Sequence, residues 1–184
     1  IGDRNTIREY ATLNRGTGDG GGVTRVGSDC LLMAYSHVAH DCQVADGVIL
    51  ANAATLAGHV EIGHHSVVGG LSAVHQFVCI GEFAFIGGKT GVAQDVPPYV
   101  LAAGERATMR GLNLVGLKRR GFNKEALQGL RKTYSLVFRS GQGRQETLDQ
   151  ALEQWGENEE VRRFVDFIRQ SERGVIPQER DTRG

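Results

Sequence analysis

The sequence feature that most constrains the fold is a six-residue repeat. Aliphatic side chains recur at every sixth position through twelve successive repeats, from Val26 to Val92. Four residues after each aliphatic residue comes a small or β-branched one, and Gly or Ala often follows it directly. A helix requires a period near 3.6 and an isolated strand a period of 2, so a period of six fits short strands joined by tight corners. The pattern predicts a parallel β-helix, with one large and one small side chain of each repeat pointing inward.

The repeat also predicts the size of one coil. Hexapeptide coils are typically triangular, so three repeats make one turn of about 18 residues. Positions one coil apart then lie directly above one another at the strand spacing of about 4.8 Å. A β-sandwich would need irregular turns and long loops, which twelve uninterrupted matches disfavour. We therefore assign residues 1–100 to a parallel β-helix.

A glycine-rich insertion at residues 17–25 is the one break in the rhythm. The stretch formally contains GxGxxG, starting at Gly16, but no helix follows and the hexads resume at once. It is therefore not a dinucleotide-binding fingerprint. The composition favours a flexible loop that bulges from a corner, and a functional alternative is a loop that folds over a site.

Residues 101–184 are predicted to form an α-helical domain. Pro97 and Pro98 cannot join a sheet ladder and suit an exit from the last coil. From about residue 177 we expect a disordered tail. Three helices are expected: residues 123–139, capped by Asn123; 147–155, opened by a capping box at Thr147; and 158–174, capped by Asn158.

The composition excludes some classes of protein. The 21 basic side chains balance the 21 acidic ones, so the net charge favours neither nucleic acid nor a membrane surface. No apolar run approaches the roughly 20 residues of a spanning helix. The three cysteines form no CxxC pair, which favours a reduced, cytoplasmic setting. Because Ile1 is already in phase with the repeat, we expect further coils upstream of it.

Titratable side chains cluster at one place in the repeat. With a coil of three hexads, His40, Gly58 and Gln76 form one column, and Asp41 and His59 lie in the column beside it. These are corner positions that face outward. His75 adjoins the first column in sequence, and His37 lies one corner earlier. The repeat therefore predicts a vertical row of histidines along one edge, whereas His64 and His65 lie at another corner and receive no role.

Three kinds of chemistry could use this row. Zinc would require His40, His59 and His75 to converge, but their spacing spreads them over roughly two strand spacings, which disfavours a metal. General-base catalysis would use His40, with Asp41 to orient it and the backbone N–H of Gly58 to receive an oxyanion. A structural trimer with histidines in its subunit contacts is the third alternative. No GxSxG elbow is present, so direct transfer through His40 is favoured over a covalent nucleophile.

Five motifs stand in order along the chain: Ser36–Cys42, Ala51–Val60, Ala73–Phe77, Gln94–Tyr99 and Gly116–Phe122. Together they resemble one known family, the UDP-N-acetylglucosamine 3-O-acyltransferases of lipid A biosynthesis. The resemblance implies a left-handed β-helix that assembles as a homotrimer, with sites in the clefts between subunits. It implies transfer of an (R)-3-hydroxyacyl chain from acyl carrier protein to the 3-hydroxyl of UDP-N-acetylglucosamine. We expect neither a cofactor nor a metal.

The same resemblance implies roles for single residues. His40 resembles the general base, with Asp41 beside it and Gly58 as oxyanion donor. Gly88 resembles the position that sets the depth of the acyl groove. Three residues depart from the family pattern. One nucleotide contact is undefined because of Val115, and the length of the acyl chain is undefined because of Arg106 and Lys89. The substrate-positioning residues are His37, His59, His75 and Gln76, and those implied for UDP binding are Asn113, Arg119 and Arg120.

The distribution of charge supports a carrier-protein donor. Between residues 105 and 139 there are nine basic side chains and two acidic ones. Acyl carrier proteins are acidic, so such a stretch would steer them toward the chain. Two alternatives remain: the sibling enzyme that N-acylates the 3-O-acylated glucosamine on the same scaffold, and a trimeric β-helix without catalysis.

Overall fold

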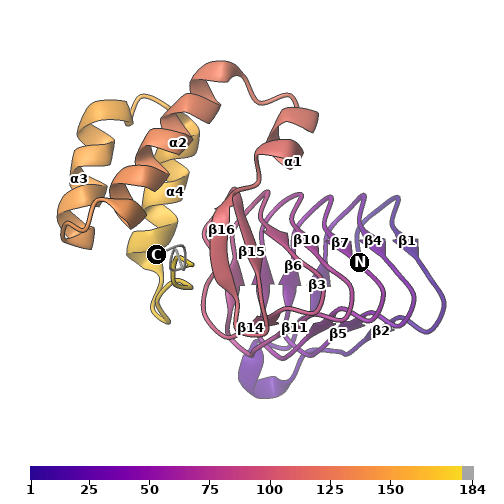
Figure 1. Ribbon diagram of the computed structural model, residues 1–184. Helices are drawn as coiled ribbons and strands as arrows, with labels where there is room; N and C mark the ends of the chain where they lie inside the picture. The colour runs from indigo at the N-terminus through magenta and orange to yellow at the C-terminus, as the bar shows by residue number, and fades with distance from the viewer. Residues whose placement is uncertain (180–184) are drawn as a thin grey trace.

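The computed structural model describes residues 1–179 and has two parts, a triangular β-helix and a group of helices at its C-terminal end (Figure 1). Most strands contain only two residues, because each chain segment turns a corner after every hexad. The strands of the coils are Thr6–Ile7 (β1), Thr12–Leu13 (β2), Arg25–Val26 (β3), Leu31–Leu32 (β4), His37–Val38 (β5), Gln43–Val44 (β6), Ile49–Leu50 (β7), Thr55–Leu56 (β8), Glu61–Ile62 (β9), Val67–Val68 (β10), Ala73–Val74 (β11), Cys79–Ile80 (β12), Phe85–Ile86 (β13) and Gly91–Val92 (β14).

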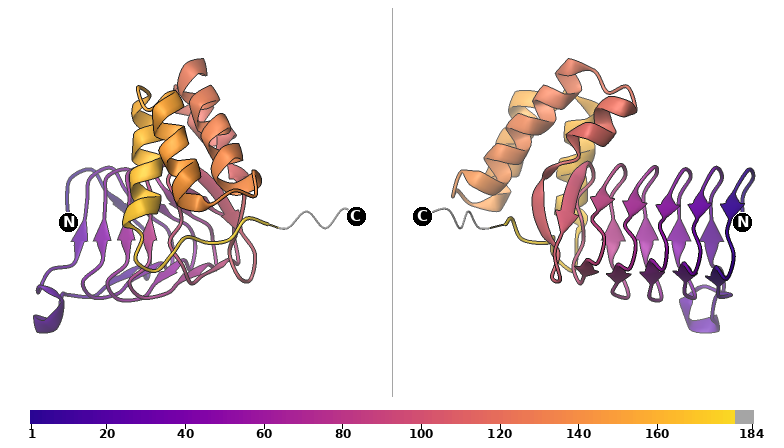
Figure 2. Two further views of the ribbon diagram at one scale, coloured as in Figure 1. Left: turned by 90° about the vertical axis from the view of Figure 1, so that its left-hand side faces the viewer. Right: turned by 45° about the vertical axis from the view of Figure 1, so that its right-hand side comes forward.

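Three parallel sheets form the faces of the prism. The first contains β1, β4, β7, β10 and β13; the second β2, β5, β8, β11 and β14; and the third β3, β6, β9 and β12. Each strand pairs with the strand three hexads later, as His37 of β5 does with Thr55 of β8, which confirms the predicted coil. The views in Figure 2 show the coils stacked in a row, with the helices at one end.

The prism interior is built from the two inward positions of the hexad. The aliphatic residue at the first place is buried, and so is the small residue four places later, for example Leu50 and Ala54, both 0% exposed. Between them the chain turns, and the residue at the third place after the aliphatic one has a positive φ near +60°. This left-handed conformation costs a non-glycine residue roughly 1–2 kcal/mol, so only the stacking of successive coils can hold so many of them. Among these residues are Tyr35, Asp41, Ala53, His59, His65, Leu71, Phe77, Phe83 and Lys89.

Beyond the last coil, the chain forms a β-hairpin that the sequence reading missed. Strand β15 (Val100–Ala103) extends the first sheet in parallel with β13, and β16 (Thr108–Leu112) returns antiparallel to it. The expectation of helix directly after residue 100 is therefore wrong for this segment. The division into two domains at that residue stays a prediction.

Four helices follow within the described residues, and two of them begin where the sequence predicted. Asn123 caps α2 (Lys124–Arg139) and Asn158 caps α4 (Glu159–Gln170), each through its side-chain oxygen. The sequence reading missed α1 (Leu114–Arg119), which Asn113 caps. It was also wrong about the capping box at Thr147, because α3 (Arg144–Trp155) starts earlier, after Gly143. None of the helices in residues 1–179 is long and apolar enough to cross a membrane.

The chain returns from α4 to the β-helix instead of fraying at residue 177. Val175 bridges to Asp95, and Gln178 bridges to Met109 of β16. Gln178 also accepts a hydrogen bond from Tyr134 of α2 at 2.6 Å. The expected disordered tail is therefore wrong for residues 177–179, and its remainder, residues 180–184, lies outside the described residues.

Since the inward aliphatic residues hold the coils together, their truncation should cost much more than that of an outward one. We predict that Leu50→Ala lowers the free energy of unfolding by about 2–5 kcal/mol. Leu71→Ala, at a corner where the side chain is 63% exposed, should change it by less than about 0.5 kcal/mol. Denaturant unfolding at one protein concentration measures both, and equal losses would contradict this account of the core.

Candidate active site

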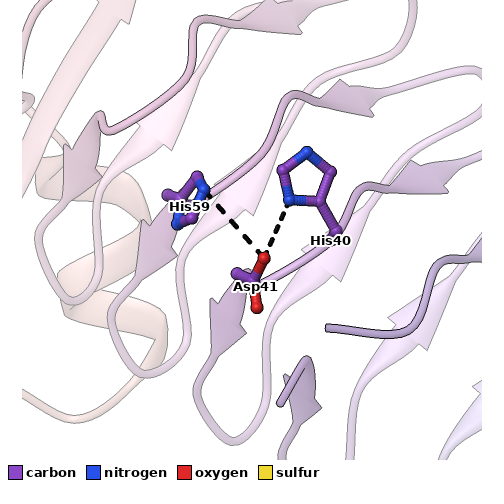
Figure 3. Close-up of side chains that lie close together, drawn as sticks. All are labelled: His40, Asp41 and His59. Atoms are coloured by element: carbon purple, nitrogen blue, oxygen red, sulfur yellow. Dashed lines mark hydrogen bonds and ion pairs between the residues drawn. The ribbon is translucent and has the colours of Figure 1, made fainter. Parts of the chain in front are cut away.

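The predicted row of histidines lies at the corner between the second and third sheets, which we call the histidine edge (residues 39–42, 57–60 and 75–78). His40 and Asp41 follow β5, and His59 follows β8 one coil later. Figure 3 shows both imidazoles turned toward the Asp41 carboxylate. The rings of His40 and His59 meet edge to face, with 5.1 Å between their centroids. The stacking thus brings side chains of two successive coils into one cluster.

Asp41 is the buried centre of this group. Its side chain has 0% exposure, although it stands at an outward corner position. Oδ2 accepts hydrogen bonds from Thr17 Oγ1 at 2.7 Å and from His40 Nδ1 at 2.8 Å. The Thr17 hydroxyl and the His40 ring lower the pKa of the Asp41 carboxyl to about 2, although burial acts in the opposite direction. Asp41 is therefore a carboxylate over the whole neutral range.

The contact with Asp41 determines which nitrogen of His40 is basic. An ionised carboxylate only accepts hydrogen bonds, so the proton of neutral His40 lies on Nδ1. Nε2 is left with a lone pair and no partner among residues 1–179. The His40 side chain is 41% exposed, so a substrate hydroxyl can reach this nitrogen.

Gly58 lies one coil above His40, directly against its imidazole ring. A β-carbon at this position would come within 2.6 Å of Cε1 and 2.8 Å of Nε2, which is closer than atoms pack. The Gly58 carbonyl accepts the Phe77 N–H, whereas its own N–H donates to no group in the described part of the chain. Glycine is thus required for the ring to sit here, and an unpaired N–H adjoins the basic nitrogen.

The other histidines predicted for the site are held by different partners. His59 Nε2 lies 4.0 Å from Asp41 Oδ2, and its ring stacks on Phe77 with 4.5 Å between centroids. His75 does not belong to this group, and its Nδ1 lies 3.3 Å from the Arg173 guanidinium. His37 lies on the outer face of β5, where Thr12 Oγ1 is 2.7 Å from its Nδ1. Gln76 is exposed one coil above Gly58.

The remaining predicted residues lie on other edges of the same prism. Gly88 is exposed at the corner between the first and second sheets, stacked above Gly70. Asn113 donates to the Phe83 carbonyl at 3.1 Å, which seats α1 on the corner between the third and first sheets. Arg119 and Arg120 lie at the C-terminal end of this helix, and both are exposed. One chain therefore does not bring the predicted nucleotide residues to His40.

The zinc alternative loses its third histidine in this arrangement. Among residues 1–179, His40, Asp41 and His59 offer ligand atoms within 4.8 Å of one another, and His75 is not in the group. Two imidazoles and a carboxylate are ligands that zinc accepts. However, Asp41 Oδ2 already accepts hydrogen bonds from the Thr17 hydroxyl and from His40 Nδ1, and a metal ion would have to displace both donors. The expectation of no metal stays a prediction.

Sequence reasoning missed the contribution of the insertion. Thr17 and Thr24 contact the side chain and the backbone of Asp41, whereas the insertion was expected to bulge freely from a corner. The functional alternative, a loop over the site, describes what the structure has. Counting coils could have revealed it, because the insertion occupies the corner directly below His40 and Asp41.

Comparisons with known proteins support the family. Residues 95–176 match the family model described as UDP N-acetylglucosamine O-acyltransferase, domain 2, and residues 24–58 match the bacterial transferase hexapeptide model. An acyl-[acyl-carrier-protein]–UDP-N-acetylglucosamine O-acyltransferase of Anaeromyxobacter sp. (strain K) is 50% identical over 175 residues, which are 95% of this chain and 68% of that protein. The chain belongs to the UDP-N-acetylglucosamine O-acyltransferase family.

Solved structures of this family have the same fold. The UDP-N-acetylglucosamine acyltransferase of Campylobacter jejuni is 47% identical with a TM-score of 0.92, over 98% of this chain and 70% of that one. The UDP-N-acetylglucosamine O-acyltransferase of Moraxella catarrhalis is 42% identical with a TM-score of 0.90, over 94% and 67%. These likenesses confirm the predicted left-handed β-helix with C-terminal helices. The chain is an acyltransferase, and the non-catalytic scaffold and the N-acylating sibling are not supported.

Because Gly58 leaves room for the His40 ring, a larger side chain at this position should displace the ring. Gly58→Ala should push the His40 ring away and lower the rate of acyl transfer by up to about 100-fold, since a displacement of roughly 1 Å is enough for such a loss. Gly143→Ala is the matched control, because its β-carbon would meet only Glu146 at 4.0 Å, far from the site. Equal rates in the two purified variants would show that the ring does not depend on Gly58.

Proposed function

We propose that the chain transfers an (R)-3-hydroxyacyl group from acyl carrier protein to the 3-hydroxyl of UDP-N-acetylglucosamine, with His40 as general base. One observation carries the mechanism. The buried carboxylate of Asp41 accepts the Nδ1–H of His40 and leaves Nε2 as an exposed base. The family supports the reaction, and this geometry supports the choice of His40 as general base.

The chemistry needs one proton relay and no covalent enzyme intermediate. His40 Nε2 takes the proton of the sugar 3-hydroxyl as its oxygen attacks the carbonyl carbon of the carrier thioester. The carbonyl oxygen becomes an oxyanion, and the unpaired N–H of Gly58, stacked on the His40 ring, is the donor we assign to it. As the intermediate collapses, the C–S bond breaks and the carrier thiolate takes the proton from His40. The Asp41 carboxylate stabilises the imidazolium that forms between these two steps.

The site is complete only in a homotrimer. The base lies on the histidine edge, whereas Asn113, Arg119 and Arg120 surround the corner between the third and first sheets of the same chain. Gly88 lies on the remaining edge. Three copies packed about an axis would bring different edges of neighbouring prisms face to face, so that one subunit supplies the base and its neighbour the nucleotide contacts.

The donor approaches from the helical end. Lys118, Arg119, Arg120 and Lys124 are exposed around the end of α1 and the start of α2. A cluster of this charge attracts an acidic carrier protein. We infer a cytoplasmic setting from that donor and from the three cysteines, which are all free thiols.

The general base has a simple test. His40→Ala should lower kcat by about 10²–10⁴-fold with little change in the KM for UDP-N-acetylglucosamine, because the lost imidazole accepts the proton of the attacking hydroxyl in the transition state and does not bind the substrate. Glu153→Ala, at an exposed position of α3 away from every predicted site residue, should leave both constants unchanged. Near-normal turnover by His40→Ala would exclude this mechanism.

The shared site predicts complementation between two inactive chains. His40→Ala and Arg120→Glu should each inactivate the trimer. When the two variants are co-folded in equal amounts, each mixed trimer should contain one site with both native residues, restoring about a quarter of the wild-type activity. A chain that carries both substitutions, mixed with wild type, controls for subunit exchange. No recovery in the first mixture would place both residues in one subunit's site, and an active Arg120→Glu trimer would remove Arg120 from it.

A further inference from the structure

The glycine-rich insertion occurs at one particular corner of the β-helix. Strands β2 and β5 pair directly, Thr12 with His37, although the chain between them is longer than one regular coil. The next pair along the same sheet, His37 with Thr55, is separated by one regular coil. The extra residues therefore lie at the corner after β2, one coil below His40 and Asp41. In Figure 1 this segment is the violet loop that projects from the bottom of the prism.

The loop is folded around Asp41. The Thr17 N–H donates to Oδ1 at 3.0 Å and to Oδ2 at 3.2 Å, and the Thr17 hydroxyl donates to Oδ2 at 2.7 Å. On the other side, Thr24 Oγ1 accepts the Asp41 N–H at 2.8 Å. The loop is closed on itself by a hydrogen bond from the Gly22 N–H to the Thr17 carbonyl at 2.8 Å.

A glycine lets the loop approach this closely. A β-carbon on Gly20 would come within 2.2 Å of the Asp41 carboxyl carbon, so any larger residue would lift the loop. Gly20 thus covers the carboxylate and Thr17 binds it, and together they remove it from solvent. A buried charge is tolerated only when hydrogen bonds satisfy it, and here Thr17 supplies two of the three donor groups.

The third donor is the Nδ1–H of His40, and it shares Oδ2 with the Thr17 hydroxyl. With Thr17 in place the carboxylate plane has one orientation, with Oδ2 toward the ring. Without it the carboxylate would be free to turn about its Cβ–Cγ bond, and His40 Nδ1 would lose a fixed acceptor. The tautomer of His40 would then no longer be imposed by the protein.

We propose that Thr17 is a positioning residue of the active site, which holds the Asp41 carboxylate so that His40 keeps its proton on Nδ1 and its lone pair on Nε2. The loop of residues 16–24 is then part of the catalytic apparatus. This inference deepens the proposed function, since it assumes that His40 is the base.

Two substitutions at Thr17 distinguish the effect of its hydroxyl group from the effect of the loop conformation. Thr17→Val keeps the shape and the backbone N–H but removes the hydroxyl donor, and Thr17→Ser restores it. Thr6→Val, on an exposed strand of the first coil, is the matched control. Thr17→Val should lower kcat about 10-fold at an unchanged KM for UDP-N-acetylglucosamine, while Thr17→Ser and Thr6→Val keep wild-type values.

The tautomer of His40 gives a readout without turnover. In ¹⁵N-histidine-labelled protein, the His40 signals are those missing from His40→Ala. Wild type and Thr17→Ser should show a protonated Nδ1 and a bare Nε2, and Thr17→Val should show averaged shifts. Gly20→Ala, which lifts the loop but keeps the hydroxyl, should also show averaged shifts. A wild-type tautomer and kcat in both Thr17→Val and Gly20→Ala would overturn the proposal, as would a fall in thermal stability with kcat unchanged.

The two proposals fail in different ways. Averaged His40 signals in Thr17→Val, combined with normal transfer by His40→Ala, would support the Thr17 contact and refute the general base. A wild-type tautomer in Thr17→Val, combined with an inactive His40→Ala, would refute the role of Thr17 and leave the general base in place.

Discussion

The pairing of each strand with its counterpart one coil later is the constraint on which this structure depends. It places one aliphatic and one small residue of every hexad in the interior, and it forces a left-handed conformation at each corner. No single two-residue strand is stable alone, so the coils support one another as in other repeat proteins. The same pairing aligns residues that are remote in sequence along the edges of the prism.

The active site combines this regularity with one exception to it. The register alone puts Gly58 over His40 and His59 beside Asp41. It does not bury the carboxylate, because a corner residue in a regular coil faces water. Burial comes from the insertion below, which covers Asp41 with Gly20 and binds it through Thr17. A charged group that would have been a solvated corner side chain thereby becomes a fixed hydrogen-bond acceptor for an imidazole.

The sequence predicted what the repeat determines. The coils, the columns at His40 and Asp41, and the helix starts at Asn123 and Asn158 depend on local pattern or local capping, and the structure has them. The hairpin of β15 and β16 was missed because its strands are held by the end of the prism rather than by a period of their own. Thr17 was missed for a related reason. Its role depends on a long-range contact with a carboxylate in the next coil, and its neighbours read as a flexible glycine loop.

The corners have a consequence for where such chemistry can arise. At the second place after the aliphatic residue, the backbone N–H is left without an acceptor in the described chain not only at Gly58 but also at Asn52, Gly70 and Gln76. The β-helix therefore offers a potential oxyanion donor at several corners, whether or not a reaction occurs there. What distinguishes one corner is the imidazole and the buried carboxylate attached to it. In this fold the backbone provides an equivalent hydrogen-bond donor at several corners. The corner that becomes an active site is the one that also has a histidine–aspartate pair.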